Sequence, residues 1–348
     1  MTTSILVWGS GAIGGTIGAH LVRSGHQVTF VDLLEDHVAQ IANGHLAIEG
    51  PISTFEIGAP AFTPSTIQGR FDTIILAVKA QHTIAASEAL KPHLSDEGFV
   101  LSAQNGLNEP KIAEVVGAKR TMGCFVNFGA DWLEPGRIMY GGRGAVVVGE
   151  IDGKITDRAR HIHTALQQFE PNALLTDNIY GYLWSKLAYG TMLYAEALTN
   201  HPIIEYFRDP ALRPLNIAMV RQVLEIAVAE GIVPMPFQSF DPDAYLRNDP
   251  DAVNDSLERI IAGRLKSTKL YSGIWRDVVV RKRPTEVGEH LAPVIEAGRR
   301  HKLPTALLEQ LAAAIKSVEQ GEAQNCLELA TGLLAKADAI EAQRTRAA

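Results

Sequence analysis

The sequence predicts an α/β fold of the doubly wound, Rossmann-like kind, followed by an all-α domain. Two observations carry this prediction. Short apolar runs rich in β-branched residues alternate with helical patterns through the first half of the chain, which indicates a parallel sheet covered by helices. From about residue 180 onward, helical periodicity dominates and strand-like runs disappear. We therefore expect a Rossmann domain at residues 1–178, a helical domain at 179–342 and a frayed tail at 343–348.

The chain opens on a strand–turn–helix–strand unit. An apolar strand at residues 5–8 is followed by three glycines spaced G-x-G-x-x-G and then by a helical pattern. In this order the first glycine permits a tight turn, the second lets the backbone approach a pyrophosphate, and the third lets helix and strand pack closely. The helix N-terminus offers N–H groups and a positive dipole end to the phosphates. The residues expected to bind a dinucleotide here are Gly9, Gly11, Ala12, Ile13 and Gly14.

Asp32 follows the second apolar run and refines this expectation. A carboxylate at the end of the second strand can accept hydrogen bonds from the adenosine ribose hydroxyls and repels a 2′-phosphate, which favours NAD over NADP. The alternative is a loop carboxylate that begins the next helix, since Leu33-Leu34-Glu35-Asp36 follows.

The remaining elements follow from the same patterns. We expect further strands at 73–78, 98–102, 120–128 and 144–148, and helices at 35–43, 82–94 and 108–116. The glycine-rich stretch 132–149 is typical of a hairpin at the sheet edge. In the second half we expect helices at about 180–198, 210–231, 252–271, 285–302, 304–319 and 324–342, punctuated by prolines.

Composition excludes several classes of protein. The 348 residues carry a net charge of -7, with 46% hydrophobic and 20% charged residues, which indicates a globular protein without a basic face for nucleic acid. Cys124 and Cys326 lie far apart and form neither a disulfide framework nor a metal motif, so we expect no metal and a reducing, cytoplasmic setting. We also expect no signal peptide and no membrane span, because neither apolar pattern is present.

Four further motifs accompany the glycine motif in a fixed order. They are Ala77-Val-Lys79-Ala, Gln104-Asn105-Gly106, Trp184-Ser-Lys186-Leu and Arg283-Pro-Thr-Glu286-Val. Together these five segments span nearly the whole chain, and in them the sequence resembles the ketopantoate reductase (2-dehydropantoate 2-reductase) family of pantothenate biosynthesis. The resemblance implies a Rossmann domain and a helical domain with the active site in the cleft between them. It also implies reduction of a 2-oxo acid to a 2-hydroxy acid, commonly with NADP, so NAD and NADP both stay open.

The resemblance makes Lys186 the catalytic lysine. A hydride that arrives at a ketone carbon leaves negative charge on the oxygen, which a positioned ammonium can stabilise and protonate. Partial burial would lower the pKa of such a lysine toward the working range. The alternative is a surface lysine, although Trp184, Leu187 and Tyr189 around it do not form a solvated face.

The resemblance assigns three more residues. Asn105, in the loop after the fourth expected strand, matches an asparagine that holds the nicotinamide, the substrate oxygen or the lysine; the alternative is a simple Asn-Gly turn. Glu286 matches the carboxylate that hydrogen-bonds the substrate hydroxyl, and it also has the place of a helix N-terminal acid. Lys79 matches a lysine that faces the cofactor, with a loop charge near the phosphates as the alternative.

The sequence departs from the family's pattern beside the lysine. The fourth and eighth positions after Lys186 hold Gly190 and Tyr194, where the family has asparagines. The Tyr194 hydroxyl can replace one amide, whereas Gly190 opens space for a bulkier ligand. Ser272 is the candidate for the substrate carboxylate, with Lys269 or Arg276 as alternatives. The departures indicate either a rewired ketopantoate site or a different 2-oxo acid.

Three functions are compatible with these residues. The first is a nicotinamide-dependent reductase with Lys186 as general acid. The second is an NAD-dependent dehydrogenase that oxidises a different hydroxy or amino acid, and the third is a dinucleotide sensor without turnover. Histidine catalysis is not indicated, because none of the 11 histidines, including His163, His201 and His290, lies in a recognised motif. The alanine- and leucine-rich helical half is compatible with a homodimer, although apolar helix faces more often form intramolecular core.

Overall fold

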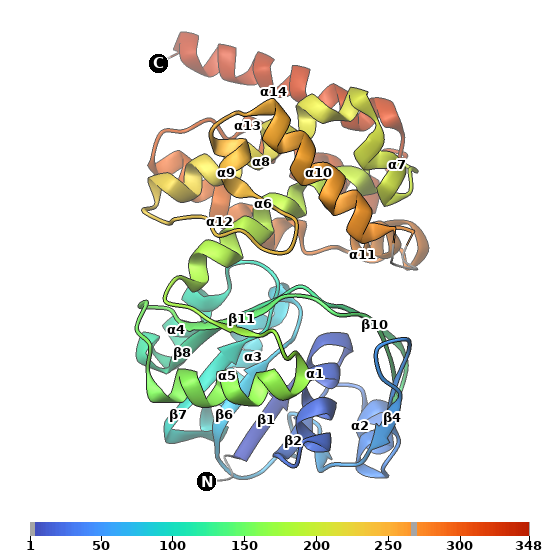
Figure 1. Cartoon of the computed structure of the whole chain (residues 1–348), viewed down its shortest axis with the longest axis vertical. Coiled ribbons are helices and arrows are strands. Elements are labelled where there is room, and N and C mark those ends of the chain that lie inside the picture. The colour runs from blue at the N-terminus through green and yellow to red at the C-terminus, as the bar shows by residue number, and fades with distance from the viewer. Residues whose placement is uncertain (1–3, 266–269, 348) are drawn as a thin grey trace. The chain divides into compact units, whose positions relative to one another are not determined.

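The computed structural model describes residues 4–265 and 270–347. It divides into two compact units, Met1–Tyr180 and Gly181–Ala348, which we describe separately. Figure 1 shows the course of the chain, with the sheets in the first unit and the helices of the second.

The main sheet of the first unit is predominantly parallel, as expected for a doubly wound fold. Its strands lie in the order β12-β11-β8-β7-β6-β1-β2-β5. β11 runs antiparallel to β8, and β12 is parallel to β11. The strands are β1 (Ser4–Trp8), β2 (Gln27–Val31), β5 (Ala61–Phe62), β6 (Phe71–Leu76), β7 (Leu94–Ser102), β8 (Thr121–Val126), β11 (Val146–Glu150) and β12 (Leu174–Leu175).

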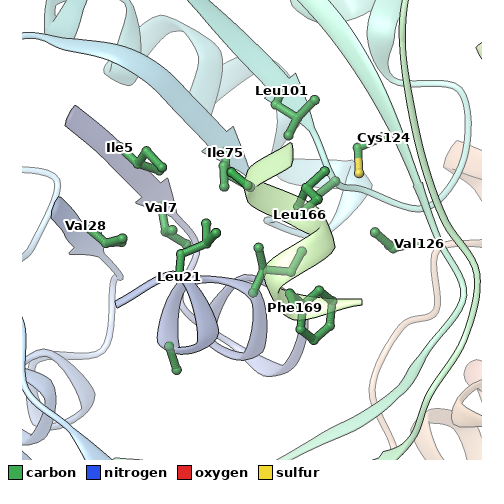
Figure 2. Packing of buried hydrophobic residues seen from close by; sticks show 14 of the residues in the cluster. Ile5, Val7, Leu21, Val28, Ile75, Leu101, Cys124, Val126, Leu166 and Phe169 are labelled. Carbon is green, nitrogen blue, oxygen red and sulfur yellow. The ribbon is translucent and has the colours of Figure 1, made fainter. Parts of the chain in front are cut away.

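Helices cover both faces of this sheet, which explains the continuous apolar runs of its central strands. On one face, α1 (Ala12–Arg23) and α5 (Asp157–Phe169) pack against alternate strand residues. Figure 2 shows Val7 and Ile75 of the sheet gathered with Leu21 of α1 and Phe169 of α5. On the other face, α3 (Thr83–Leu90) and α4 (Glu109–Val116) cover the intervening strand residues. α2 (Glu35–Ala42) follows β2.

A second, four-stranded sheet corrects the expectation of a hairpin at the edge of the main sheet. β9 (Gly129–Glu134) and β10 (Arg137–Gly142) do form a hairpin, but β10 pairs in parallel with β3 (Leu46–Glu49), which pairs with β4 (Phe55–Ile57). Only β11, at the end of the glycine-rich stretch, joins the main sheet. The second sheet also packs on α1. Ile138 of β10 lies so close to Gly15 of α1 that a Cβ at Gly15 would be 2.3 Å from Ile138 Cδ1.

The strand order places a topological switch point between β1 and β6. The chain goes from β1 to β2 on one side and later returns to β6 on the other. In doubly wound sheets, ligands bind at the carboxyl ends of the strands where the order reverses. The loops that leave β1 and β6 at this point carry the glycine motif and Lys79.

The second unit is helical, as expected. Its first helix, α6, begins at the last residues of the first unit. A π-helical turn, Arg276–Val280, follows α11. α14 continues through Ala347, so the expected tail is helical up to that residue, and Ala348 lies outside the described residues. The helices are α6 (Ile179–Ala197), α7 (Ile203–Arg208), α8 (Arg213–Ala229), α9 (Pro242–Leu246), α10 (Pro250–Arg264), α11 (Gly273–Trp275), α12 (Val287–Arg300), α13 (Ala306–Glu319) and α14 (Leu327–Ala347).

Candidate active site

The three glycines of the motif occupy three different environments. Gly9 has a φ of +94°, and a Cβ there would lie 2.9 Å from Val78 Cγ1. A Cβ at Gly14 would lie 2.1 Å from the carbonyl oxygen of Gly9. By contrast, a Cβ at Gly11 would meet nothing within 4 Å. Packing therefore requires the first and third glycines, while the second faces the open space that a pyrophosphate needs.

The start of α1 also fits an anionic ligand. The helix begins at Ala12, with Gly11 as its N-cap and no acidic side chain in the first turn, which includes Ile13. The first N–H groups of a helix have no intrahelical acceptor, and the dipole places partial positive charge there. The residues present therefore suit the phosphates of a dinucleotide.

Asp32 is fixed beside the glycine loop. Its Oδ2 accepts hydrogen bonds from the backbone N–H of Ser10 at 2.9 Å and from the Ser10 hydroxyl at 3.2 Å. Its Oδ1 accepts from the N–H of Leu34, the N-cap residue of α2, at 3.1 Å. The carboxylate thus helps to begin the next helix, as the alternative interpretation holds. It also stays partly exposed, so it can still accept bonds from a ligand.

His37 joins the glycine loop to the second sheet, and the sequence analysis missed it. This buried ring bonds through Nε2 to the Ser10 carbonyl at 2.8 Å, and its Nδ1 accepts from the Gly136 N–H at 2.9 Å. A backbone N–H can only donate, so Nδ1 must be unprotonated and Nε2 carries the hydrogen. No motif signals this pairing, because Gly136 is 99 residues away in the sequence.

The loops that carry Lys79 and Asn105 lie at the same edge of the sheet. Val78, which packs against Gly9, immediately precedes the partly exposed Lys79. Gln104 donates a hydrogen bond from Nε2 to the Val78 carbonyl at 2.8 Å. The exposed Asn105 follows directly. The structure therefore brings the predicted cofactor residues of the first unit together.

In the second unit, α6 presents Lys186 from an otherwise buried stretch. Residues 181–185 and 187–189 are all buried, whereas Lys186 is partly exposed. Gly190 lies one turn further on the same face of the helix. A Cβ at Gly190 would meet nothing within 4 Å, so the space beside this turn is open.

Tyr194, His290 and Glu286 form a cluster. The Tyr194 hydroxyl lies 2.9 Å from His290 Nδ1, and His290 Nε2 lies 4.0 Å from Glu286 Oε1. Burial, together with the negative charges of Glu286, Glu319 and Asp277, holds the pKa of Tyr194 well above its usual value. The phenol therefore stays neutral and keeps its hydroxyl proton.

His290 was not expected to have a role, although the sequence carries a signal for it. Glu286 is the N-cap residue of α12. His290 is four residues further on, and this spacing places both side chains on one face of the helix.

Ser272 is anchored to α6 rather than to the cluster around Tyr194. Its hydroxyl accepts a hydrogen bond from the Trp275 N–H at 2.9 Å and caps α11. Its own N–H donates to Glu196 Oε1 at 3.4 Å. Burial raises the pKa of Glu196 to about 7. The hydroxyl predicted to bind the substrate carboxylate thus already has a helix-capping partner.

The basic residues near Ser272 separate into different roles. Arg281 and Arg283 each form an ion pair with Asp277 at 2.9 Å. Arg276 begins the π-helical turn. Lys269, the other alternative, lies outside the described residues.

Within residues 4–265 and 270–347, no three His, Cys, Asp or Glu side chains are placed to hold a metal ion. Over the same residues, the helices are too short or too polar to cross a membrane.

A doubly wound sheet with an open glycine loop, followed by a helical unit with a partly buried lysine, defines a dinucleotide-dependent oxidoreductase. The chain belongs to the ketopantoate reductase family. The family model described as "Ketopantoate reductase PanE/ApbA" matches residues 5–153, and that of its C-terminal part matches residues 178–319.

Individual relatives agree with this assignment. The 2-dehydropantoate 2-reductase of Aquifex aeolicus is 24% identical over 326 residues, which cover 92% of this chain and 98% of the relative. The 2-dehydropantoate 2-reductase of Pyrococcus horikoshii is 32% identical over 183 residues, which cover 52% of this chain and 59% of the relative. Among solved structures, 2-dehydropantoate 2-reductase from Geobacter metallireducens has a TM-score of 0.78 and 25% identity, and covers 90% and 99% of the chains. D-mandelate dehydrogenase with NADH and anilino(oxo)acetate has a TM-score of 0.79 at 20% identity, covers 91% and 99%, and shares the fold.

Alanine at Gly11 and at Gly14 should have different consequences. Gly11→Ala places a methyl group in open space, so stability should change by less than about 0.5 kcal/mol. NADH binding should weaken about tenfold or more, because the methyl would occupy the space expected for the phosphates. Gly14→Ala drives a methyl into the Gly9 carbonyl, so both stability and binding should fall. Thermal unfolding and NADH fluorescence titration measure the two effects. Wild-type affinity in Gly11→Ala would contradict the phosphate site.

Glu196 should make stability depend on pH. Its pKa is raised from 4.5 to about 7, so the folded protein holds the proton more tightly than the unfolded chain. The associated stability is complete below pH 4.5 and is lost as the pH rises toward about 7. As the pH rises over this range, the free energy of unfolding of the wild type should therefore fall by up to about 3 kcal/mol more than that of Glu196→Gln.

Urea unfolding at several pH values measures this difference. The exposed Glu205→Gln variant serves as the control and should keep the wild-type pH dependence. Parallel curves for Glu196→Gln and wild type would show that folding does not raise the pKa of the Glu196 carboxyl.

Proposed function

We propose that the protein catalyses the NAD-dependent reduction of a 2-oxo acid to a 2-hydroxy acid, with Lys186 as general acid. The observation that carries this proposal is the partial exposure of Lys186 on a buried stretch of α6, one turn from the open side at Gly190. Membership of the ketopantoate reductase family supports the reaction type.

The roles of the chain's own residues follow from their chemistry. A nicotinamide cofactor, when bound, supplies hydride to the carbonyl carbon. The Lys186 ammonium stabilises the negative charge that develops on the carbonyl oxygen and donates the proton that completes the hydroxyl. Glu286 accepts a hydrogen bond from that hydroxyl, and Asn105 orients the nicotinamide or the substrate oxygen through its amide. Tyr194 contributes a neutral hydroxyl. This hydroxyl lies beside one nitrogen of the His290 ring, and the other ring nitrogen lies beside Glu286.

The substrate should carry a larger side group than the family's asparagine pattern would accommodate. Gly190 has no side chain and faces open space, so a bulkier substituent fits beside Lys186. The likeness in fold to D-mandelate dehydrogenase, whose structure holds NADH and anilino(oxo)acetate, is in keeping with such a substrate. Ser272 remains the candidate for the substrate carboxylate, provided that its capping bond to Trp275 is shared or released.

Asp32 carries the proposal that the cofactor is NAD(H). Hydrogen bonds from Ser10 and Leu34 fix its carboxylate beside the glycine loop. An ionised carboxylate there accepts bonds from ribose hydroxyls and repels a 2′-phosphate. Leu33, which follows directly and is 75% exposed, offers that phosphate no positive charge.

Two further proposals concern the direction of the reaction and the oligomeric state. The same Asp32 favours the second candidate, oxidation of a different hydroxy or amino acid with NAD, because cellular NAD is mostly in its oxidised form. We also propose a homodimer, since a ketopantoate reductase from Staphylococcus aureus is described as dimeric.

Lys186→Ala tests the general acid. We expect kcat to fall by about 10²-fold or more, because the proton donor is lost, while the Kd for NADH changes by less than about twofold. Ketopantoate and 2-oxo acids with aromatic side groups should be assayed with NADH, and the corresponding hydroxy acids with NAD. The exposed Lys336→Ala variant in α14 is the matched control. Undiminished turnover in Lys186→Ala would exclude this role, and cofactor binding by wild type without any turnover would favour the sensor.

Asp32→Ala tests the cofactor preference. Removal of the carboxylate should raise the Kd for NADH about tenfold and leave the Kd for NADPH unchanged or lower, because attraction to the ribose and repulsion of the phosphate are lost together. The exposed Asp36→Ala variant is the control. Equal effects on both cofactors would show that Asp32 does not contact the ribose.

A further inference from the structure

A layer of buried polar side chains lies beneath the loops that carry Lys79 and Asn105. Lower in the interface between β7 and the helices α3 and α4, the buried residues are apolar, among them Val100, Leu90 and Ile112. Near the carboxyl ends of the strands they become polar. This polar layer consists of Thr83, Ser87, Ser102, Gln104, Asn108 and Glu109, each at most 3% exposed.

Gln104 is central to the hydrogen bonds of this layer. Its Nε2 donates to the Val78 carbonyl at 2.8 Å and to the Thr83 hydroxyl at 2.9 Å. Because the carbonyl of Val78 can only accept, the amide nitrogen must face it, which fixes the orientation of the side chain. Gln104 therefore fixes the backbone of Val78, the residue that directly precedes Lys79.

The two neighbours of Gln104 extend the connection on both sides. The Thr83 hydroxyl, which accepts from Gln104, donates to the Ala80 carbonyl at 2.8 Å and lies 3.3 Å from Asn108 Oδ1. Asn108 donates from Nδ2 to the Asn105 carbonyl at 2.7 Å. The loop after β6 and the loop after β7 are thus joined by side chains that solvent does not reach.

We propose that Gln104 is a positioning residue that sets the separation of the Lys79 and Asn105 loops, and so the geometry of the nicotinamide end of the cofactor site. The inference rests on the proposed nicotinamide-dependent function. Without the Gln104 amide, the partly buried Val78 carbonyl would lose this donor, and the loop would shift toward water to replace the bond. Such a shift moves Lys79 and also moves Val78 away from Gly9.

Gln104→Met is the principal test, because methionine preserves length and volume but cannot donate. We expect the Kd for NADH to rise about tenfold, kcat to fall and the KM for the 2-oxo acid to change by less than about twofold. Amide hydrogen exchange in residues 77–83 and 104–108 should become faster. Ser87→Ala is the matched control, since its buried hydroxyl has no hydrogen-bond partner among the described residues. It should leave affinity and loop exchange unchanged.

Thr83 provides a second, gentler pair of variants. Thr83→Val removes the hydroxyl that accepts from Gln104 at almost constant volume and should reproduce the faster loop exchange and the weaker NADH binding. Thr83→Ser keeps the hydroxyl and should restore wild-type behaviour. This pair tests the positioning role independently if Gln104→Met does not fold.

The outcomes separate this inference from the proposed function. A lower melting temperature in Gln104→Met, with wild-type Kd and loop exchange, would overturn the positioning role and leave only a packing role. Loop exchange is measured without cofactor. If wild-type protein fails to bind NADH, the proposed function fails, while unchanged loop exchange in Gln104→Met and Thr83→Val would still overturn the inference by itself.

Discussion

The close approach of two loops at the switch point is the constraint on which the nucleotide-binding unit depends. Gly9 packs against Val78, and Gly14 packs against the Gly9 carbonyl, so any side chain at either glycine would separate β1, α1 and the loop after β6. The same contact leaves Gly11 facing open space. Close packing and an open phosphate position thus have one origin, the absence of Cβ atoms at a turn where two parallel strands end. Asp32, which follows β2, holds the same glycine loop by accepting hydrogen bonds from Ser10.

α6 has a comparable importance for the second unit. A helix buried almost all round leaves few positions for a reactive group, and Lys186 occupies one of them beside the open turn at Gly190. Further along, its buried Glu196 and Tyr194 hold the segment with Ser272 and the start of α12. The same helix therefore displays the lysine and anchors the neighbouring segments. We propose that the shape and polarity beside α6 determine the substrate and that Lys186 transfers the proton.

The sequence predicted the main sheet and most helices because their signals are local. Strands buried on both faces are continuous apolar runs, and the glycine motif fixes the first unit of the sheet. The second sheet was not predicted, because β3 and β10 are far apart in the sequence and nothing local specifies their pairing. α5 was not predicted, although its buried Ala159, Ile162, Leu166 and Phe169 recur at the spacing of an amphipathic helix. In the candidate site, His37 bonds backbone groups of Ser10 and Gly136, and this pairing leaves no sequence signature. Gln104 stands in a recognised motif, but its bond to the distant Val78 carbonyl could not be predicted from it. His290 could have been found from its spacing to Glu286.

The central claim is that the glycine loop, fixed Asp32 and the loops joined by Gln104 form one preorganised site for NAD(H). Parallel titration of the wild-type protein with NADH and NADPH, followed by nicotinamide fluorescence, tests it most directly. The account predicts saturable binding of both, with NADH bound at least about tenfold more tightly, because the carboxylate is already placed for ribose hydroxyls and against a 2′-phosphate. Tighter binding of NADPH, or no binding of either cofactor, would contradict it.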